Sequence, residues 1–258
     1  MTNRIGAIAF NTFREAVRDR VLYNLILFAL LMIGSSLLLG QITIAVQKQL
    51  LINLGLTAIS IFGVLIAIFI GIGLVSKEID KRTLYTVLTR PVQRWEFIVG
   101  KFFGLAGTLV VNAGLMTIGF FVALLFLMRG LERSDASILA AVYFILLQLM
   151  MVTAIALVLS SFSTPIESAV LTFAIFVVGS FNEDLRGFAD AAKGTAHYVG
   201  LGVSYLIPNF SSLNYIASVA HGNPIPLNMI ILNTAYAMLY AGAAVCAASL
   251  IFQNRNMK

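Results

Sequence analysis

The chain has 258 residues, of which 60% are hydrophobic and only 11% are charged, and its mean hydropathy is +0.96. A soluble domain carries about 25% charged residues, so this composition excludes an ordinary soluble protein and indicates an integral membrane protein. The formal net charge of +6 falls in short segments between long apolar stretches, which indicates orientation in a membrane rather than nucleic-acid binding.

Long windows without Asp, Glu, Lys or Arg predict the membrane spans. A helix rises about 1.5 Å per residue, so roughly 20 apolar residues cross the hydrocarbon core of a bilayer. A backbone in hydrocarbon must satisfy its own hydrogen bonds, and the windows lack the alternation of barrel strands, so we expect helices. The predicted spans are residues 21–40, 54–75, 102–127, 137–160, 165–181 and 228–252. The expected fold is therefore an all-α integral membrane protein with six transmembrane helices, forming one domain over residues 1–258.

The segment before the first span, residues 1–20, has a different pattern. Ile5, Ile8 or Ala9, and Phe13 recur at helical spacing, and charged side chains fill much of the remaining surface. This pattern predicts an amphipathic helix at the cytoplasmic membrane interface. A charged tail that only sets the orientation of the chain is the alternative.

The positions of Lys and Arg predict the topology. With a cytoplasmic N-terminus and six spans, twelve of these residues lie inside and five lie outside, so both termini are expected in the cytoplasm. A seventh span over residues 198–220 is the alternative, but it would weaken the bias to ten against seven. We therefore expect residues 182–227 to form an external segment of short, partly embedded helices. Tyr198, Tyr205, Phe210 and Tyr215 would suit the boundary between lipid and water.

Two connections carry local signals. Thr164, Pro165 and Glu167 have the order of a helix capping box and predict that the fifth span starts sharply. The longest cytoplasmic connection, residues 76–101, has an apolar edge at Leu84 and Leu88 between charged residues. Such a short amphipathic helix can dock in the groove of a partner protein, although an ordinary basic loop is also compatible with its charge.

The residues offer little for catalysis. His197 and His221 have no metal-ligand spacing around them, and the pair Gly100 and Lys101 lacks the first glycine and the following Ser or Thr of a phosphate-binding loop. We therefore expect no enzyme activity, no catalytic residue, no metal site and no cofactor in this chain. Because no ionisable side chain lies centrally in a predicted span, energy for transport is expected from a partner. Several polar residues within the spans are expected either to line a path or to bond between helices, the second being favoured: Asn24, Asn112, Gln148, Thr153 and Asn233.

The cytoplasmic connection carries a family pattern. Glu78, Thr83-Leu84, Leu88, Pro91, Arg94 and Gly100-Lys101, placed between the second and third of six spans, resemble the permeases of type-2 ATP-binding-cassette (ABC) exporters. One departure is Arg82, where many members of that family have glycine. The resemblance implies an N-terminal interfacial helix, a coupling helix between spans two and three, and re-entrant external helices between spans five and six. Residues 1–20, 77–90 and 182–227 are their counterparts.

The resemblance also implies partners and site residues. It implies a second permease copy, as a homodimer or a related heterodimer, surrounding lipid, and separate cytoplasmic ATPase subunits that bind ATP and Mg. Expected contacts of the coupling helix with the ATPase are Glu78, Arg82, Thr83, Leu84 and Leu88. Pro91, Arg94 and Lys101 are expected to anchor the loop at lipid headgroups, and Arg94 and Lys101 alternatively to reach the partner. The expected location is the bacterial cytoplasmic membrane.

Two further functions stay open at this point. The first is an ion-coupled carrier or channel that works without an ATPase, and the second is a membrane scaffold that transports nothing. The sequence does not identify a substrate.

Overall fold

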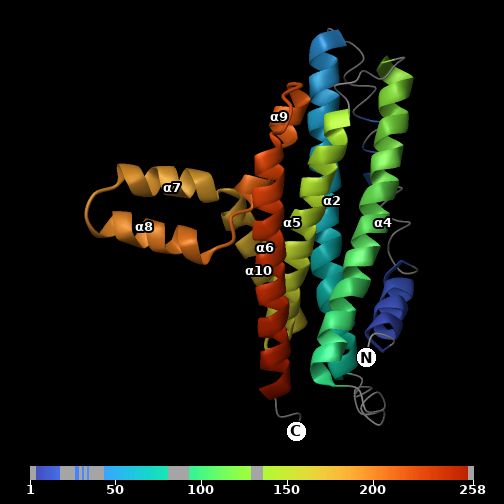
Figure 1. Ribbon diagram of the computed structural model, residues 1–258, viewed down its shortest axis with the longest axis vertical. Helices are drawn as coiled ribbons and strands as arrows, with labels where there is room; N and C mark the ends of the chain where they lie inside the picture. Colours follow the sequence, from blue (N-terminus) through green and yellow to red (C-terminus); the bar gives the residue numbers. More distant parts are fainter. Residues whose placement is uncertain are drawn as a thin grey trace.

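The computed structural model describes residues 4–17, 27, 28, 31, 34, 44–80, 93–128 and 136–254 of the chain. The first element is a helix over residues 4–17, which carries no label in Figure 1. The labelled elements are α2 (Ile44–Asp80), α4 (Arg94–Met128), α5 (Ser137–Ser160), α6 (Pro165–Ser180), α7 (Asn182–Ala191), α8 (Thr195–Leu206), η2 (Ser211–Leu213), α9 (Ile216–Ala220) and α10 (Leu227–Asn254).

Four long helices form the bundle. Among the described residues, α2, α4, α5 and α10 are each long and apolar enough to cross a membrane, and α6 with α7 adds a fifth candidate that is bent by 60°. The predicted spans from 54–75 onward are thus confirmed as helices. The predicted span over residues 21–40 lies almost wholly outside the described residues, so the six-span count stays a prediction.

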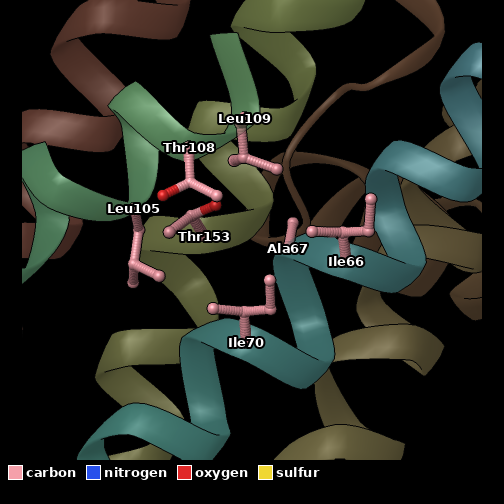
Figure 2. Close-up of a pocket in the computed structure, with 7 residues that line it drawn as sticks. All are labelled: Ile66, Ala67, Ile70, Leu105, Thr108, Leu109 and Thr153. Atoms are coloured by element: carbon pink, nitrogen blue, oxygen red, sulfur yellow. The ribbon is translucent and has the colours of Figure 1, made fainter. Parts of the chain in front are cut away.

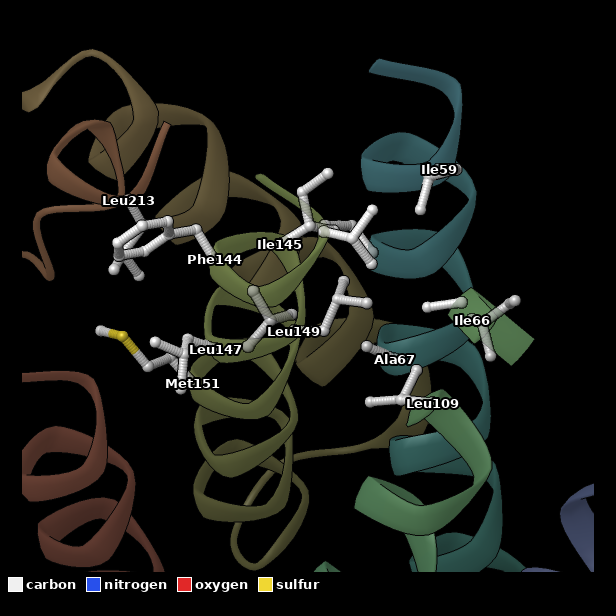
Figure 3. Close-up of a cluster of buried hydrophobic side chains, with 14 of the residues drawn as sticks. Ile59, Ile66, Ala67, Leu109, Phe144, Ile145, Leu147, Leu149, Met151 and Leu213 are labelled. Carbon is white, nitrogen blue, oxygen red and sulfur yellow. The ribbon is translucent and has the colours of Figure 1, made fainter. Parts of the chain in front are cut away.

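Helix α5 is the centre of the bundle. It contacts α2, α4, α6 and α10, and nearly every side chain from Ala141 to Leu157 is buried. A helix that is apolar on all sides is expected in such a position, because it has no face to offer to water. Figure 3 shows α5 side chains such as Phe144 and Leu149 between the neighbouring helices. Leu149 packs against Gly63, where a Cβ atom would lie only 2.6 Å from its Cδ1.

One end of the bundle collects the segments predicted to be cytoplasmic. The end of α2, the start of α4, the turn between α5 and α6, and the end of α10 lie together there, with the N-terminal helix beside α4 (Figure 1). We call this end the coupling end. At 37 residues, α2 is about 55 Å long, so it extends well beyond the roughly 30 Å of hydrocarbon.

The predicted external segment, residues 182–227, folds in two parts. Helices α7 and α8 form a hairpin that projects sideways from the bundle (Figure 1). The next two elements, η2 and α9, fold back onto the bundle, where α9 contacts α2 and α5 and η2 contacts α5. The window 198–220 is broken after Leu206, so it does not form one spanning helix. Phe210 is 1% exposed and packs on Phe176, so its predicted place at the lipid boundary is wrong, whereas Tyr198 and Tyr205 are both 75% exposed.

Candidate functional site: the coupling end and the helices above it

The coupling segment begins as a continuation of α2. Glu78 lies in the last turn of this helix, which runs without a break to Asp80. The next helix, α4, begins at Arg94. The predicted contact residues Arg82, Thr83, Leu84 and Leu88, together with Pro91, lie outside the described residues, as do the side chains of Glu78 and Arg94. The structure therefore leaves the contact role of this segment as a prediction.

The start of α4 is held by its own side chains. The backbone N–H of Gln93 donates to the Glu96 Oε2 atom at 3.1 Å, and the Trp95 indole N–H donates to the Gln93 side-chain oxygen. Glu96 is 1% exposed. A carboxylate in the first turn satisfies a backbone donor that has no partner within the helix, and it interacts favourably with the positive helix end. This arrangement fixes where the coupling segment enters α4.

The Lys101 side chain is buried at the start of α4. Its side chain is only 2% exposed, and its ammonium group lies 5.4 Å from the centre of the Phe97 ring. Phe97 in turn stacks on Phe252 of α10, with 5.9 Å between ring centres. Together these side chains join the start of α4 to the last turn of α10. The expected role of Lys101 at lipid headgroups or at the partner stays a prediction.

The N-terminal helix packs along the same part of α4. A Cβ atom on Gly100 would lie 2.8 Å from Ile8, and one on Gly104 would lie 2.6 Å from the Ala9 carbonyl oxygen and from Thr12. Small residues permit such close approach between membrane helices. The helix therefore touches protein on the side that the apolar pattern indicated. Its position at the membrane interface stays a prediction.

Most polar side chains of the spans are engaged. Gln148 of α5 donates to the Ser60 hydroxyl of α2 at 3.3 Å, and Asn233 of α10 donates to the Ser212 carbonyl at 2.9 Å and to the Tyr215 hydroxyl at 3.0 Å. Thr153 bonds to a carbonyl of its own helix. These contacts favour bonding within and between helices over a polar path, with one exception: both polar atoms of the buried Asn112 side chain lack a partner among the described residues. Asn24 lies outside them.

An apolar opening lies between α2 and α6. It has a volume of 640 Å³ and is lined only by apolar side chains: Leu65, Ile68, Phe69, Ile72, Pro165, Ile166, Ala169, Val170 and Phe173. We call it the α2–α6 groove. Phe69 and Phe173 are its two aromatic lining residues. The sequence does not mark these residues as lining a groove, because almost every neighbouring residue is apolar too.

A second gap lies at the junction of α2, α4 and α5 and has no room for a water molecule. Figure 2 shows Thr108 and Thr153 at its edge, beneath Leu109 and across from Ile66 and Ala67. Both hydroxyls donate to carbonyls four residues earlier in their own helices. This gap is a packing defect between three helices rather than a binding site.

Comparison with known proteins supplies the family. No group of three or more His, Cys, Asp or Glu side chains suited to a metal ion occurs among the described residues. None of the curated proteins compared with the chain matches it. The family model described as ABC-2 family transporter protein matches residues 7–257, nearly the whole sequence. With its long apolar helices, the chain belongs to the ABC-2 family of transporter proteins, as a multi-pass membrane protein of the permease type.

Proposed function

We propose that this chain is the membrane-spanning permease subunit of an ATP-driven exporter, working as a dimer with separate cytoplasmic ATPase subunits. The observation that carries the proposal is the coupling end in a chain of this family: α2 and α4 converge there on a basic connection. ATP and Mg would bind to the partner ATPase. Both termini would lie in the cytoplasm of a bacterial cell.

The shape of α2 supports a mechanical role. This helix is continuous from Ile44 to Asp80, so a push on its last turn is transmitted along a rod rather than absorbed in a flexible joint. It contacts α5 and α6, and residues 65–72 of α2 form one wall of the α2–α6 groove. Closure of the ATPases would move residues 77–90, and rotation of α2 would widen or narrow this groove.

The α2–α6 groove favours the proposal that the chain works as a dimer. Its lining is apolar, and exposed apolar side chains such as Phe69 and Ile166 stand at its rim. A second copy placed against it would enclose a path between the two subunits. Alternate opening of this path toward each side of the membrane would then produce transport.

The proposal is tested by reversing charges in the coupling segment. We expect Glu78→Lys combined with Arg82→Glu to reduce co-purification of the ATPase and transport-coupled ATP hydrolysis by at least about tenfold, because reversed charges face the unchanged partner surface. The matched control is Lys193→Glu, a charge reversal on an exposed residue of the α7–α8 hairpin. It should leave both quantities within about twofold of the unmodified protein, because the hairpin lies away from the coupling segment.

Two results would contradict the proposal. Unchanged ATPase binding and hydrolysis in the double reversal would remove the coupling role. Substrate movement by the reconstituted chain alone, driven by a sodium or proton gradient, would show that no ATPase is required.

A further inference from the structure

The α7–α8 hairpin is attached to the bundle at its base only. Its two helices pack on each other: the Asn182 amide donates to the carbonyls of Ser204 and Ile207, and Gly200 packs against Ala189. Beyond its base, the hairpin projects sideways from the long helices (Figure 1). Exposed apolar side chains on it include Phe188, Val199 and Leu206. Its outer surfaces therefore face whatever surrounds the bundle.

With Pro165 at the boundary of the hydrocarbon on the coupling side, the length of α6 would place this hairpin inside the bilayer. At 16 residues, α6 is about 24 Å long, which is less than the roughly 30 Å of hydrocarbon. The chain then bends by 60° into α7. The hairpin thus begins within the leaflet that lies away from the coupling end, which we call the distal leaflet.

Charge is divided between the two helices of the hairpin. Helix α8 contains no Asp, Glu, Lys or Arg, whereas α7 contains Glu183, Asp184, Arg186 and Asp190. In Figure 1, α7 lies farther from the coupling end than α8 does. The uncharged helix therefore lies deeper in the distal leaflet, and the charged helix lies toward its headgroups. This order is favourable because placing charged side chains in hydrocarbon costs free energy.

Arg186 is the unusual residue of this surface. Its side chain is half-buried, its Nε atom is buried without a hydrogen-bond partner in the described part of the chain, and its guanidinium lies 5.0 Å from the centre of the Tyr205 ring. Glu183 and Asp190 lie within about 60° of it around the α7 axis, at 100° per residue. Yet no ion pair joins them to it within the described part of the chain. A partly desolvated cation with unused donors calls for an anion from outside the protein.

We propose that Arg186 binds the phosphate of a phosphatidylethanolamine molecule in the distal leaflet, while Glu183 or Asp190 receives the ammonium group of the same headgroup. The guanidinium lies over the Tyr205 ring, and its paired N–H groups can bind a phosphate with two hydrogen bonds. The apolar side chains of α8 provide the surface for the acyl chains. A lipid, rather than free phosphate, is indicated because the cation lies at membrane depth.

The charges around Arg186 decide which headgroup fits. Two carboxylates flank a single cation along this face of α7, and Asp184 lies on the far side of the helix. A purely anionic headgroup would bring its negative charge close to both carboxylates, which is unfavourable. A headgroup that carries phosphate and a primary ammonium matches the alternating order of charges. The site should therefore prefer phosphatidylethanolamine to phosphatidylglycerol.

The test measures lipid binding to the purified full-length chain in a maltoside detergent by native mass spectrometry. The probes are phosphatidylethanolamine and phosphatidylglycerol with identical short acyl chains, and inorganic phosphate. We expect phosphatidylethanolamine to bind more tightly than phosphatidylglycerol, and Arg186→Gln to weaken it by about tenfold or more, as for loss of a charge-assisted pair. Arg186→Lys should retain part of the affinity, because it keeps the charge but loses the planar pair of donors.

The control is Lys193→Gln, which removes one positive charge from the turn of the same hairpin. Equal weakening by this variant, tighter binding of phosphatidylglycerol, or displacement of the lipid by millimolar inorganic phosphate would each overturn the proposal. If Arg186→Gln fails to fold, the affinity for phosphatidylethanolamine is compared between the unmodified protein and the variants Tyr205→Leu and Arg186→Lys. Both variants keep the positive charge at position 186, and both should bind this lipid more weakly than the unmodified protein does. Because no ATPase enters this experiment, its failure would not bear on the proposed coupling.

Discussion

Single polar residues inside the bundle differ in how well they are satisfied. Asn233 uses its amide group in two hydrogen bonds with the segment that folds back after α8, and it thereby ties α10 to Ser212 and Tyr215. Asn112 of α4 is 2% exposed and has no partner for either polar atom among the described residues. An unsatisfied buried amide costs about 1–3 kcal/mol. The two residues look alike in the sequence but have opposite energetic roles in the fold.

Replacing these two asparagines tests that difference. Asn112→Leu should leave the protein as stable or stabilise it by about 1 kcal/mol, because it removes an unpaired polar group of similar size. Asn233→Leu should destabilise by about 1–2 kcal/mol, because it leaves a carbonyl and a hydroxyl unpaired. The measurement is the midpoint of thermal unfolding in detergent. A loss from Asn112→Leu as large as that from Asn233→Leu would show that Asn112 has a partner after all.

At the scale of elements, the N-terminal helix can pack closely on α4 only because α4 has glycines at the contact. Gly104 has no room for a Cβ atom, because one would lie 2.6 Å from the Ala9 carbonyl oxygen. Thr12 and Ala16 of the N-terminal helix are both buried. This contact lies about one turn from Lys101 and about three turns from the start of α4. A movement of the coupling segment would therefore be transmitted through α4 to the N-terminal helix.

The matched pair Gly104→Ala and Gly114→Ala tests this contact. Both positions lie in α4, but a Cβ atom on Gly114 would meet nothing within 4 Å. Gly104→Ala should destabilise by about 1–3 kcal/mol, the usual cost of overpacking. Gly114→Ala should be neutral or gain up to about 1 kcal/mol from helix propensity.

A labelling assay gives a second measurement for the same pair. In a Cys246→Ser background, a cysteine at Thr12 should react with maleimide faster in Gly104→Ala than in the parent protein. Equal unfolding midpoints and equal labelling rates for the two alanine variants would mean that the N-terminal helix does not depend on this contact.

At the scale of the whole molecule, charge and architecture agree on topology. The helices bring the ends of α2 and α10 and the start of α4 to one end of the bundle, where Lys and Arg are most frequent in the sequence (Figure 1). The turn of the α7–α8 hairpin, with Lys193, lies away from that end. Positive loops stay in the cytoplasm, so the coupling end is expected to be cytoplasmic.

This topology is tested with single cysteines in a Cys246→Ser background. In intact cells, a membrane-impermeant maleimide should label a cysteine at Lys193 but not one at Arg14 or Gln253. Permeabilised cells should show labelling at Arg14 and Gln253, which are exposed side chains. Labelling of position 193 and position 253 from the same side would contradict the arrangement.

Much of the fold follows from local composition. The predicted windows 102–127, 137–160 and 228–252 fall within α4, α5 and α10, and the capping box over Thr164 and Glu167 is present at the start of α6. These features are readable because a backbone in hydrocarbon must form its own hydrogen bonds wherever the chain is apolar for long enough. The family pattern around residues 78–101 is likewise local, and the match over residues 7–257 confirmed the family.

The tertiary structure decided which faces meet. It enclosed Lys101 beside Phe97, buried Phe210, left Asn112 without a hydrogen-bond partner among the described residues and set Arg186 on a hairpin away from the bundle. The sequence by itself determined that the chain enters a membrane as long helices, where they lie, and which family pattern their longest connection carries. It did not determine these contacts, because almost every residue in a span is apolar and no face is marked for a particular neighbour. Only the fit of shapes between helices distant in the sequence makes that choice.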